Sequence, residues 1–79
     1  MIIFDKLWEI MKKKGVSTYR LREICLIDSR TIKRLKINGS VETKTLDKIC
    51  HALDCDIEDI VTHVKDIENA GNIYPRPLK

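Results

Sequence analysis

The chain of 79 residues lacks the long apolar stretch and the paired cysteines on which membrane-spanning and disulfide-stapled proteins depend. A membrane helix needs about 20 consecutive apolar residues, and no such run occurs. The opening segment MIIFDKLWEIMKKK also lacks the apolar region and cleavage site of a signal peptide. The three cysteines are an odd number and form no C-x-x-C pair, which argues against a disulfide framework and a zinc knuckle. We therefore expect a cytoplasmic protein with reduced thiols, no membrane contact, and no metal or other cofactor.

Glycine and proline are scarce, with three and two residues, and aromatic residues make up only 5%. Both prolines fall in the last stretch, ENAGNIYPRPLK, so residues 65–79 are predicted to form an irregular tail. Residues 1–64 remain for one domain with a small core. No convincing strand pattern is present, which favours an all-α fold, and such a small helical core leaves no room for a substrate cleft. We therefore expect neither an enzyme nor a site for a small-molecule ligand.

Charged residues are distributed unevenly along the sequence. Residues 17–38 carry six Lys or Arg against two acidic residues, a net charge of +4. Residues 39–64 carry two Lys against six acidic residues, a net charge of −4. This asymmetry suggests that one side of the molecule faces a polyanion, although two solvated faces with a chance charge bias would give the same pattern.

Apolar residues recur at helical spacing in five segments, and capping residues lie at their borders. Gly15 is placed to end the first helix, and Asn38-Gly39 to end the third. Ser17 or Thr18, Asp28, Thr43 and Asp56 are predicted N-caps. The segment Met1-Ile2-Ile3 is predicted to pack on the domain as an extended arm. The predicted helices span residues 4–14, 18–25, 29–37, 44–53 and 57–64.

The second and third predicted helices are separated by only a few residues around Leu26-Ile27, which is the spacing of a helix-turn-helix. Apolar residues at suitable positions can hold the two helices at a fixed angle. On the third helix, Ser29, Arg30 and Lys33 share one side, so they can enter a groove of DNA together. A solvated basic face is the alternative for these polar residues. The apolar residues predicted to point inward from the two helices and their turn are Leu21, Ile24, Cys25, Ile27, Ile32 and either Leu35 or Ile37.

With these residues in place, the chain resembles the Cro/phage-repressor type (XRE family) of helix-turn-helix domain, and most of all its small stand-alone bacterial members. The resemblance is carried by KKKGVSTYRL, IDSRTIKRL and TLDKICHALDCDIEDIV, and it covers about residues 4–64. It implies a five-helix, lambda-repressor-like domain that binds double-stranded DNA as a transcriptional regulator on a two-fold operator. We expect a repressor that acts as a homodimer.

The resemblance also implies which residues touch DNA. The predicted base contacts come from the first half of the third helix: Asp28, Ser29, Arg30, Lys33 and Arg34. The predicted phosphate contacts come from the start of the second helix and from the segment after the third: Thr18, Tyr19, Arg20, Lys36, Asn38, Thr43 and Lys44.

Two residues depart from the family pattern. Leu26 stands where the family usually has glycine, and Arg22 stands where it usually has a small residue. A positive φ at Leu26 would cost on the order of 1 kcal/mol or more. The turn is therefore built without positive φ, or Leu26 contributes by packing. We predict that Leu26 is at least partly buried and that Arg22 points its guanidinium to solvent.

Other readings of the chain stay open. An antirepressor-like helix-turn-helix module that binds a protein partner instead of DNA is the main alternative. A metal or catalytic site formed by Cys50, His51 and Cys55 is not expected, because Cys50 lies on an apolar helical stripe and no fourth ligand has suitable spacing. Candidate dimer surfaces are the arm of residues 1–3, the exposed side of the fifth predicted helix, and the tail around Ile67, Ile73 and Tyr74.

Overall fold

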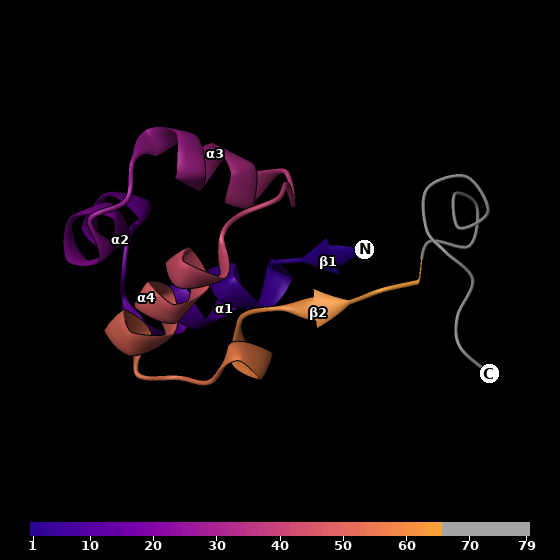
Figure 1. Ribbon diagram of the computed structural model, residues 1–79. Helices are drawn as coiled ribbons and strands as arrows, with labels where there is room; N and C mark the ends of the chain where they lie inside the picture. The colour runs from indigo at the N-terminus through magenta and orange to yellow at the C-terminus, as the bar shows by residue number, and fades with distance from the viewer. Residues whose placement is uncertain (66–79) are drawn as a thin grey trace.

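The computed structural model describes residues 1–65, which form four α-helices, one short 3-10 helix and a two-stranded sheet (Figure 1). Predictions that concern the tail, including Ile67, Ile73 and Tyr74 as dimer contacts, lie outside the described residues. No helix among residues 1–65 has the length and apolar character needed to cross a membrane. The elements are β1 (Ile2–Ile3), α1 (Asp5–Lys14), α2 (Thr18–Cys25), α3 (Ser29–Lys36), α4 (Thr43–Leu53), η1 (Ile57–Asp59) and β2 (Thr62–His63).

The core is made by pairs of apolar residues three or four positions apart, one pair from each helix. This spacing places both members of a pair on the same helical face, so every helix buries one stripe and leaves the rest to solvent. The prediction that Ile24 points inward is wrong, because its side chain is 45% exposed on the flank of α2. The buried pairs are Leu7 and Met11, Leu21 and Cys25, Ile32 and Leu35, and Ile49 and Leu53, with Phe4 and Ile60 completing the core.

Side-chain caps start the two central helices. Of the two alternatives for α2, Ser17 is the cap, and its hydroxyl oxygen accepts from the Arg20 N–H at 3.1 Å. At α3, Asp28 Oδ1 accepts from the Thr31 N–H at 2.9 Å, which confirms the predicted cap. The prediction for Thr43 is wrong: α4 begins one residue earlier than expected, so Glu42 takes the capping position, and it makes no side-chain cap bond.

All four helices end in the same way. The residue after each helix, or one further on at α3, has a left-handed backbone, with φ of 67° at Gly15, 55° at Leu26, 57° at Asn38 and 52° at Asp54. The next N–H then reaches back five residues to a helix carbonyl, as in a Schellman ending. The bonds run from Val16 to Met11, from Ile27 to Arg22, from Gly39 to Arg34 and from Cys55 to Cys50.

This ending corrects the prediction for Leu26. The turn does use a positive φ there, and the Leu26 side chain is 84% exposed rather than partly buried. The left-handed residue turns its side chain away from the helix, and the following residue, Ile27, supplies the apolar contact with the core. Arg22 is exposed to solvent, as predicted.

The fifth predicted helix is wrong. Residues 57–59 form only one 3-10 turn, started by Asp56, whose N–H donates to the Asp59 carboxylate at 2.9 Å. The chain then extends as β2 and pairs antiparallel with β1, with Ile2 opposite His63 and Ile3 opposite Thr62. The expectation that no strand occurs is therefore also wrong, whereas the packed N-terminal arm is confirmed. Strand pairing satisfies backbone groups of the arm, and the β-branched residues Val61, Thr62 and Val64 suit an extended chain better than a helix.

We predict that replacing Leu26 with glycine stabilises the fold. Glycine adopts the left-handed conformation without the steric cost that a Cβ incurs, and the exposed leucine side chain contributes little burial. The free energy of unfolding should rise by about 0.5–1 kcal/mol, measured by urea denaturation, after allowing for the greater freedom of glycine in the unfolded chain. The matched control is Leu26→Ala, which removes the same side chain but keeps the strained φ, and it should give no gain. Equal losses in both variants would contradict this account.

We predict that the cap at Asp28 contributes stability that depends on pH. Bonds from the Thr31 backbone and hydroxyl hold the pKa of Asp28 below its usual value, and Arg30 and Arg34 lower it further. A carboxylate with a lowered folded pKa stabilises above its unfolded pKa of about 3.9, and this contribution is lost as pH falls through the folded value. Thermal melts of wild type and Asp28→Ala should therefore differ at pH 7 and converge below pH 4. Asp28→Asn, which keeps an acceptor without the charge, should lie between them at pH 7.

Candidate DNA-binding interface

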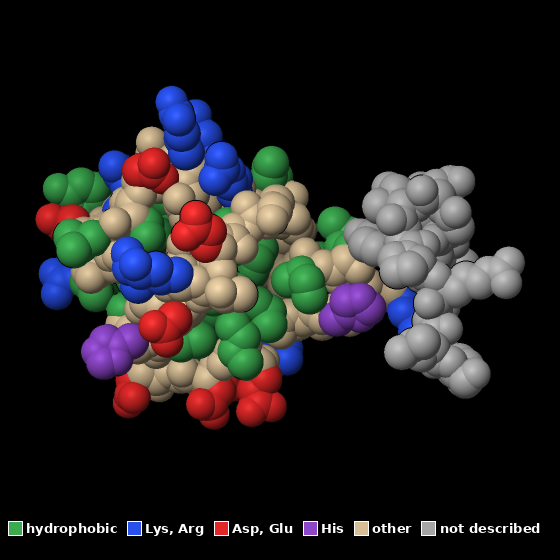
Figure 2. All heavy atoms as spheres, in the orientation of Figure 1, with side chains coloured by type: hydrophobic (Ala, Val, Ile, Leu, Met, Phe, Trp, Pro, Cys, Tyr) green, Lys and Arg blue, Asp and Glu red, His purple; other side chains and the backbone are tan. Residues whose placement is uncertain are grey.

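The face of α3 opposite its buried stripe is strongly basic. Ile32 and Leu35 point into the core at 5% and 0% exposure, and the residues on the opposite side, Arg30, Lys33 and Arg34, are all exposed. Figure 2 shows Lys and Arg side chains projecting from the edge of the molecule formed by α3. The structure therefore brings the predicted basic side chains together on one helix face at the surface.

The helix pair that carries this face is packed on the rest of the domain. Helix α2 packs against both α4 and α3, and Leu21 and Cys25 are its buried contacts. The Sγ of Cys25 also donates to the Lys48 carbonyl of α4 at 3.6 Å. Helix α3 lies above this base at the edge of the molecule (Figure 1). Helix α3 thus packs on the domain along one side and is exposed along the other, as a helix that enters a DNA groove must be.

Arg34 differs from the other two basic residues of this face. Its side chain lines shallow hollows beside the loop between α3 and α4, together with Ser40, Val41 and Glu42. Arg30 and Lys33 line neither of these two hollows. The sequence analysis did not single out Glu42, which lines the same two hollows as Arg34. Arg34 is therefore the basic residue of this face that also borders the loop between α3 and α4.

Asp28 caps α3 and is also exposed at the surface. Its Oδ1 accepts both bonds from Thr31, the N–H at 2.9 Å and the hydroxyl at 2.8 Å. Its pKa is lowered first by the backbone bond, so the group is a carboxylate at neutral pH. Because one oxygen takes both bonds, Oδ2 is left to accept from another donor, such as a base amino group. Ser29, next to it, is exposed as well.

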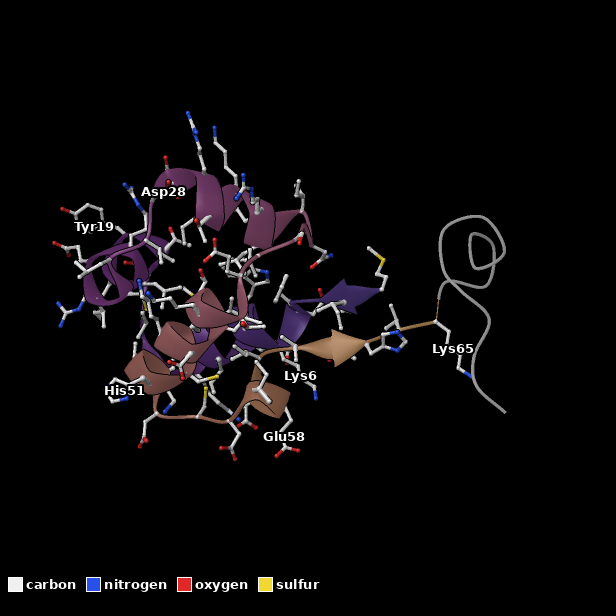
Figure 3. All side chains as sticks on the ribbon, in the orientation of Figure 1. Lys6, Tyr19, Asp28, His51, Glu58 and Lys65 are labelled. Carbon is white, nitrogen blue, oxygen red and sulfur yellow. The ribbon has the colours of Figure 1, made fainter. Side chains whose placement is uncertain are left out.

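The start of α2 carries exposed polar side chains. Tyr19 is 66% exposed and points away from the domain (Figure 3), Arg20 is exposed, and Thr18 is half-buried. The positive end of the α2 dipole is at this terminus, where Ser17 caps a single N–H group. An exposed helix start of this kind suits a phosphate group.

The segment after α3 holds a residue whose structural role the sequence did not reveal. Asn38 Oδ1 accepts from the Phe4 N–H at 2.9 Å, across 34 residues of chain. The prediction that the Asn38-Gly39 pair ends the third helix is confirmed, with a φ of 57° at Asn38, but nothing in the sequence pointed to Phe4 as a partner of Asn38. Asn38 therefore ties the end of α3 to the start of α1, and only its amide nitrogen is left for a phosphate. The other predicted phosphate contacts of this region, Lys36, Thr43 and Lys44, are exposed.

The charge asymmetry of the sequence is also an asymmetry in space. Figure 2 shows acidic side chains along the edge formed by the end of α4 and by η1, opposite the basic edge at α3. Asp54, Asp56, Glu58 and Asp59 are the exposed acidic residues of that region. The molecule thus presents a basic side and an acidic side, which would orient it in the field of a polyanion. Within residues 1–65, no three His, Cys, Asp or Glu side chains are grouped to hold a metal ion.

Comparison with known proteins gives two matches. The family model for the Cro/C1-type helix-turn-helix DNA-binding domain matches residues 6–66. A crystal structure of the transcriptional regulator VanUg, form II, is similar over 82% of this chain and 87% of that one, with 28% identical residues and a TM-score of 0.78. No curated protein matches the chain. The resemblance to the Cro/phage-repressor type is confirmed, although with four helices in place of five, and the chain belongs to the family of Cro/C1-type helix-turn-helix DNA-binding domains.

Proposed function

We propose that this chain is a sequence-specific transcriptional repressor that inserts α3 into the major groove of double-stranded DNA. The observation that carries the proposal is the exposed basic face of α3, with Arg30 and Lys33 opposite the buried Ile32 and Leu35. Membership of a DNA-binding family supports the same function. In this proposal residues 1–64 are the DNA-binding domain and residues 65–79 are a tail outside it.

Base reading is proposed for the residues at the start and on the outer face of α3. An Arg side chain donates two bonds to O6 and N7 of guanine, and Lys33 can bind the same edge as a single charge. Asp28 can accept from a cytosine amino group through Oδ2, which keeps its cap intact. Ser29 suits either kind of base edge. The proposed set is Asp28, Ser29, Arg30, Lys33 and Arg34.

Phosphate binding is proposed for two surfaces beside α3. One is the start of α2, where the helix dipole and exposed polar side chains act together. The other is the segment between α3 and α4, with the start of α4. These contacts set the register of α3 on the duplex and make the affinity depend on salt. The proposed residues are Thr18, Tyr19, Arg20, Lys36, Asn38, Thr43 and Lys44.

A homodimer is part of this proposal. Helix α3 has 8 residues, so it reaches only a few base pairs, and a two-fold pair of such helices would double the contacts on a palindromic site. Of the three surfaces expected from the sequence, the arm is exposed in part: Met1 is 37% and Ile2 is 45% accessible. The surface expected on a fifth helix becomes the outer side of η1, where Ile57 is 48% exposed.

A second candidate function is favoured by one observation. Two large apolar side chains flank α3, Leu26 at its start with 84% exposure and Ile37 at its end with 75% exposure. Exposed apolar residues at both ends of a surface helix suit a protein partner as well as the methyl groups of thymine. A module that binds another regulator through α3 is therefore the alternative.

We predict that Arg30→Ala combined with Lys33→Ala weakens binding to specific DNA at least tenfold. Each lost base contact is worth about 1–3 kcal/mol. The measurement is fluorescence anisotropy with a duplex selected from a random pool, at two salt concentrations, because the salt slope separates phosphate contacts from base contacts. If the variant also discriminates poorly between selected and random duplexes, base reading is supported.

The matched control for this experiment is Lys6→Ala with Lys13→Ala, which removes the same charge from the side of α1 that lies beside Glu58 and Asp59. The control should bind specific DNA nearly as well as wild type. Two outcomes would reject DNA binding in favour of the protein-partner function: no binding at low salt, or equal effects of the two double variants.

We predict that the chain binds its operator as a dimer. Sedimentation velocity should show two protomers on each selected duplex, and the selected sequences should contain an inverted repeat with half-sites about one helical turn apart. A monomer both free and on DNA, with a site lacking two-fold symmetry, would show that the dimer proposal is wrong while leaving DNA binding intact.

A further inference from the structure

The end of α4 brings two thiols together. The Cys55 N–H donates to the Cys50 carbonyl at 3.0 Å, and the Asp54 N–H donates to the His51 carbonyl at 3.3 Å, across the left-handed Asp54. In this Schellman ending, the residue after the left-handed one packs on the residue five positions earlier. The same two positions of α1 hold Met11 and Val16, an apolar pair. In α4 they hold cysteines, and both lie half-buried against the same core.

This pair differs from the third cysteine. Cys25 is 4% exposed and donates its Sγ to the Lys48 carbonyl, so it is a core residue with its own partner. Cys50 and Cys55 are only half-buried, at the edge of the core. A small reagent can therefore reach the pair and not Cys25, which makes Cys25 an internal reference within the same chain.

The surroundings of the pair disfavour negative charge. Burial raises the pKa of both thiols. Nearby carboxylates raise these pKa values further. The pKa of Cys50 is raised by Asp47, Asp56 and Asp59. The pKa of Cys55 is raised by Asp59 and lowered by Lys14. The reduced pair is therefore two protonated thiols at neutral pH, and neither these thiols nor a disulfide would place negative charge among the carboxylates. The thiolate that starts an exchange is a minor species. No third ligand for a metal stands beside the pair in the part of the chain that the structure describes.

We propose that Cys50 and Cys55 are a redox site that closes to an intramolecular disulfide by exchange with a small-molecule disulfide. The thiolate of one cysteine attacks a sulfur of the small disulfide, whose S–S bond breaks and releases one small thiol. The second cysteine attacks the protein sulfur of the resulting mixed disulfide and releases the second small thiol. Two protein thiols are oxidised, one small disulfide is reduced, and the two protons leave on the small thiols.

The closed bond would lock the turn between α4 and η1. This turn leads to β2, which pairs with β1 and thereby holds the N-terminal arm. The site lies on the acidic side of the molecule, and the proposed DNA contacts lie on the basic side. The redox proposal therefore stands or falls independently of the proposed function.

The test uses the full chain incubated with oxidised glutathione, followed by unfolding in denaturant, alkylation and mass spectrometry. The expected product has lost two hydrogen atoms, is monomeric, and carries one alkyl group, at Cys25. Cys25→Ser should close equally well. Cys55→Ser and Cys50→Ser should each stop at a glutathione adduct. Stable adducts on the wild-type pair, disulfide-linked dimers, or a bond that includes Cys25 would each overturn the proposal.

The rate of closing tests how the surroundings of the pair affect its thiols. Because both thiols are mostly protonated at neutral pH, the rate of closing should rise about tenfold from pH 7 to pH 8. Asp59→Asn should speed closing at pH 7, because the Asp59 carboxylate raises the pKa of both thiols, while the asparagine oxygen can still accept from the Asp56 N–H. A rate that is independent of pH and unchanged in Asp59→Asn would contradict the proposal.

Discussion

The left-handed residue that ends each helix is the constraint on which this structure depends. Helices of 8 to 11 residues bury only one pair of core side chains each, so they are stable only if the chain turns back at once and packs them together. The reversal is achieved four times by one positive φ and one backbone bond that spans five residues. That bond also satisfies carbonyl groups that a helix end would otherwise leave without a partner.

The same ending produces different results because different residues occupy it. At Gly15 it costs nothing, since glycine adopts this conformation freely. At Leu26 it forces a large apolar side chain into solvent directly before α3. At Asn38 it places the side-chain amide against the start of α1, and at Asp54 it brings Cys55 back onto Cys50. A single backbone solution thus determines the surroundings of α3 and of the cysteine pair.

Helical spacing and caps predicted the four α-helices, most of the core and the exposed basic face, because these follow from local pattern. The buried pairs of α2 and α3 and the caps at Ser17 and Asp28 are examples of such local order. The prediction of a fifth helix was wrong because the conformation of that segment depends on a distant part of the chain. The segment after Ile57 has apolar residues at helical spacing, yet its backbone pairs with β1, some 60 residues away. Local sequence does not encode such a partner. The bond between Asn38 and Phe4 and the shared hollows of Arg34 and Glu42 escaped prediction for the same reason. The prediction for Leu26 was wrong because we expected either a turn without positive φ or a packed side chain. The turn has the positive φ and leaves the side chain exposed.

The bond from Phe4 to Asn38 has a practical consequence for handling this protein. The first residues pair with β2, and Met1 donates its ammonium group to the Val64 carbonyl at 2.7 Å. The start of the chain is thus fastened both to the end of α3 and to the last described strand. An affinity tag fused ahead of Met1 would replace that ammonium group by an amide and place new chain beside the paired strands. For biochemical work with this domain, an N-terminal tag should be removed before affinities are compared.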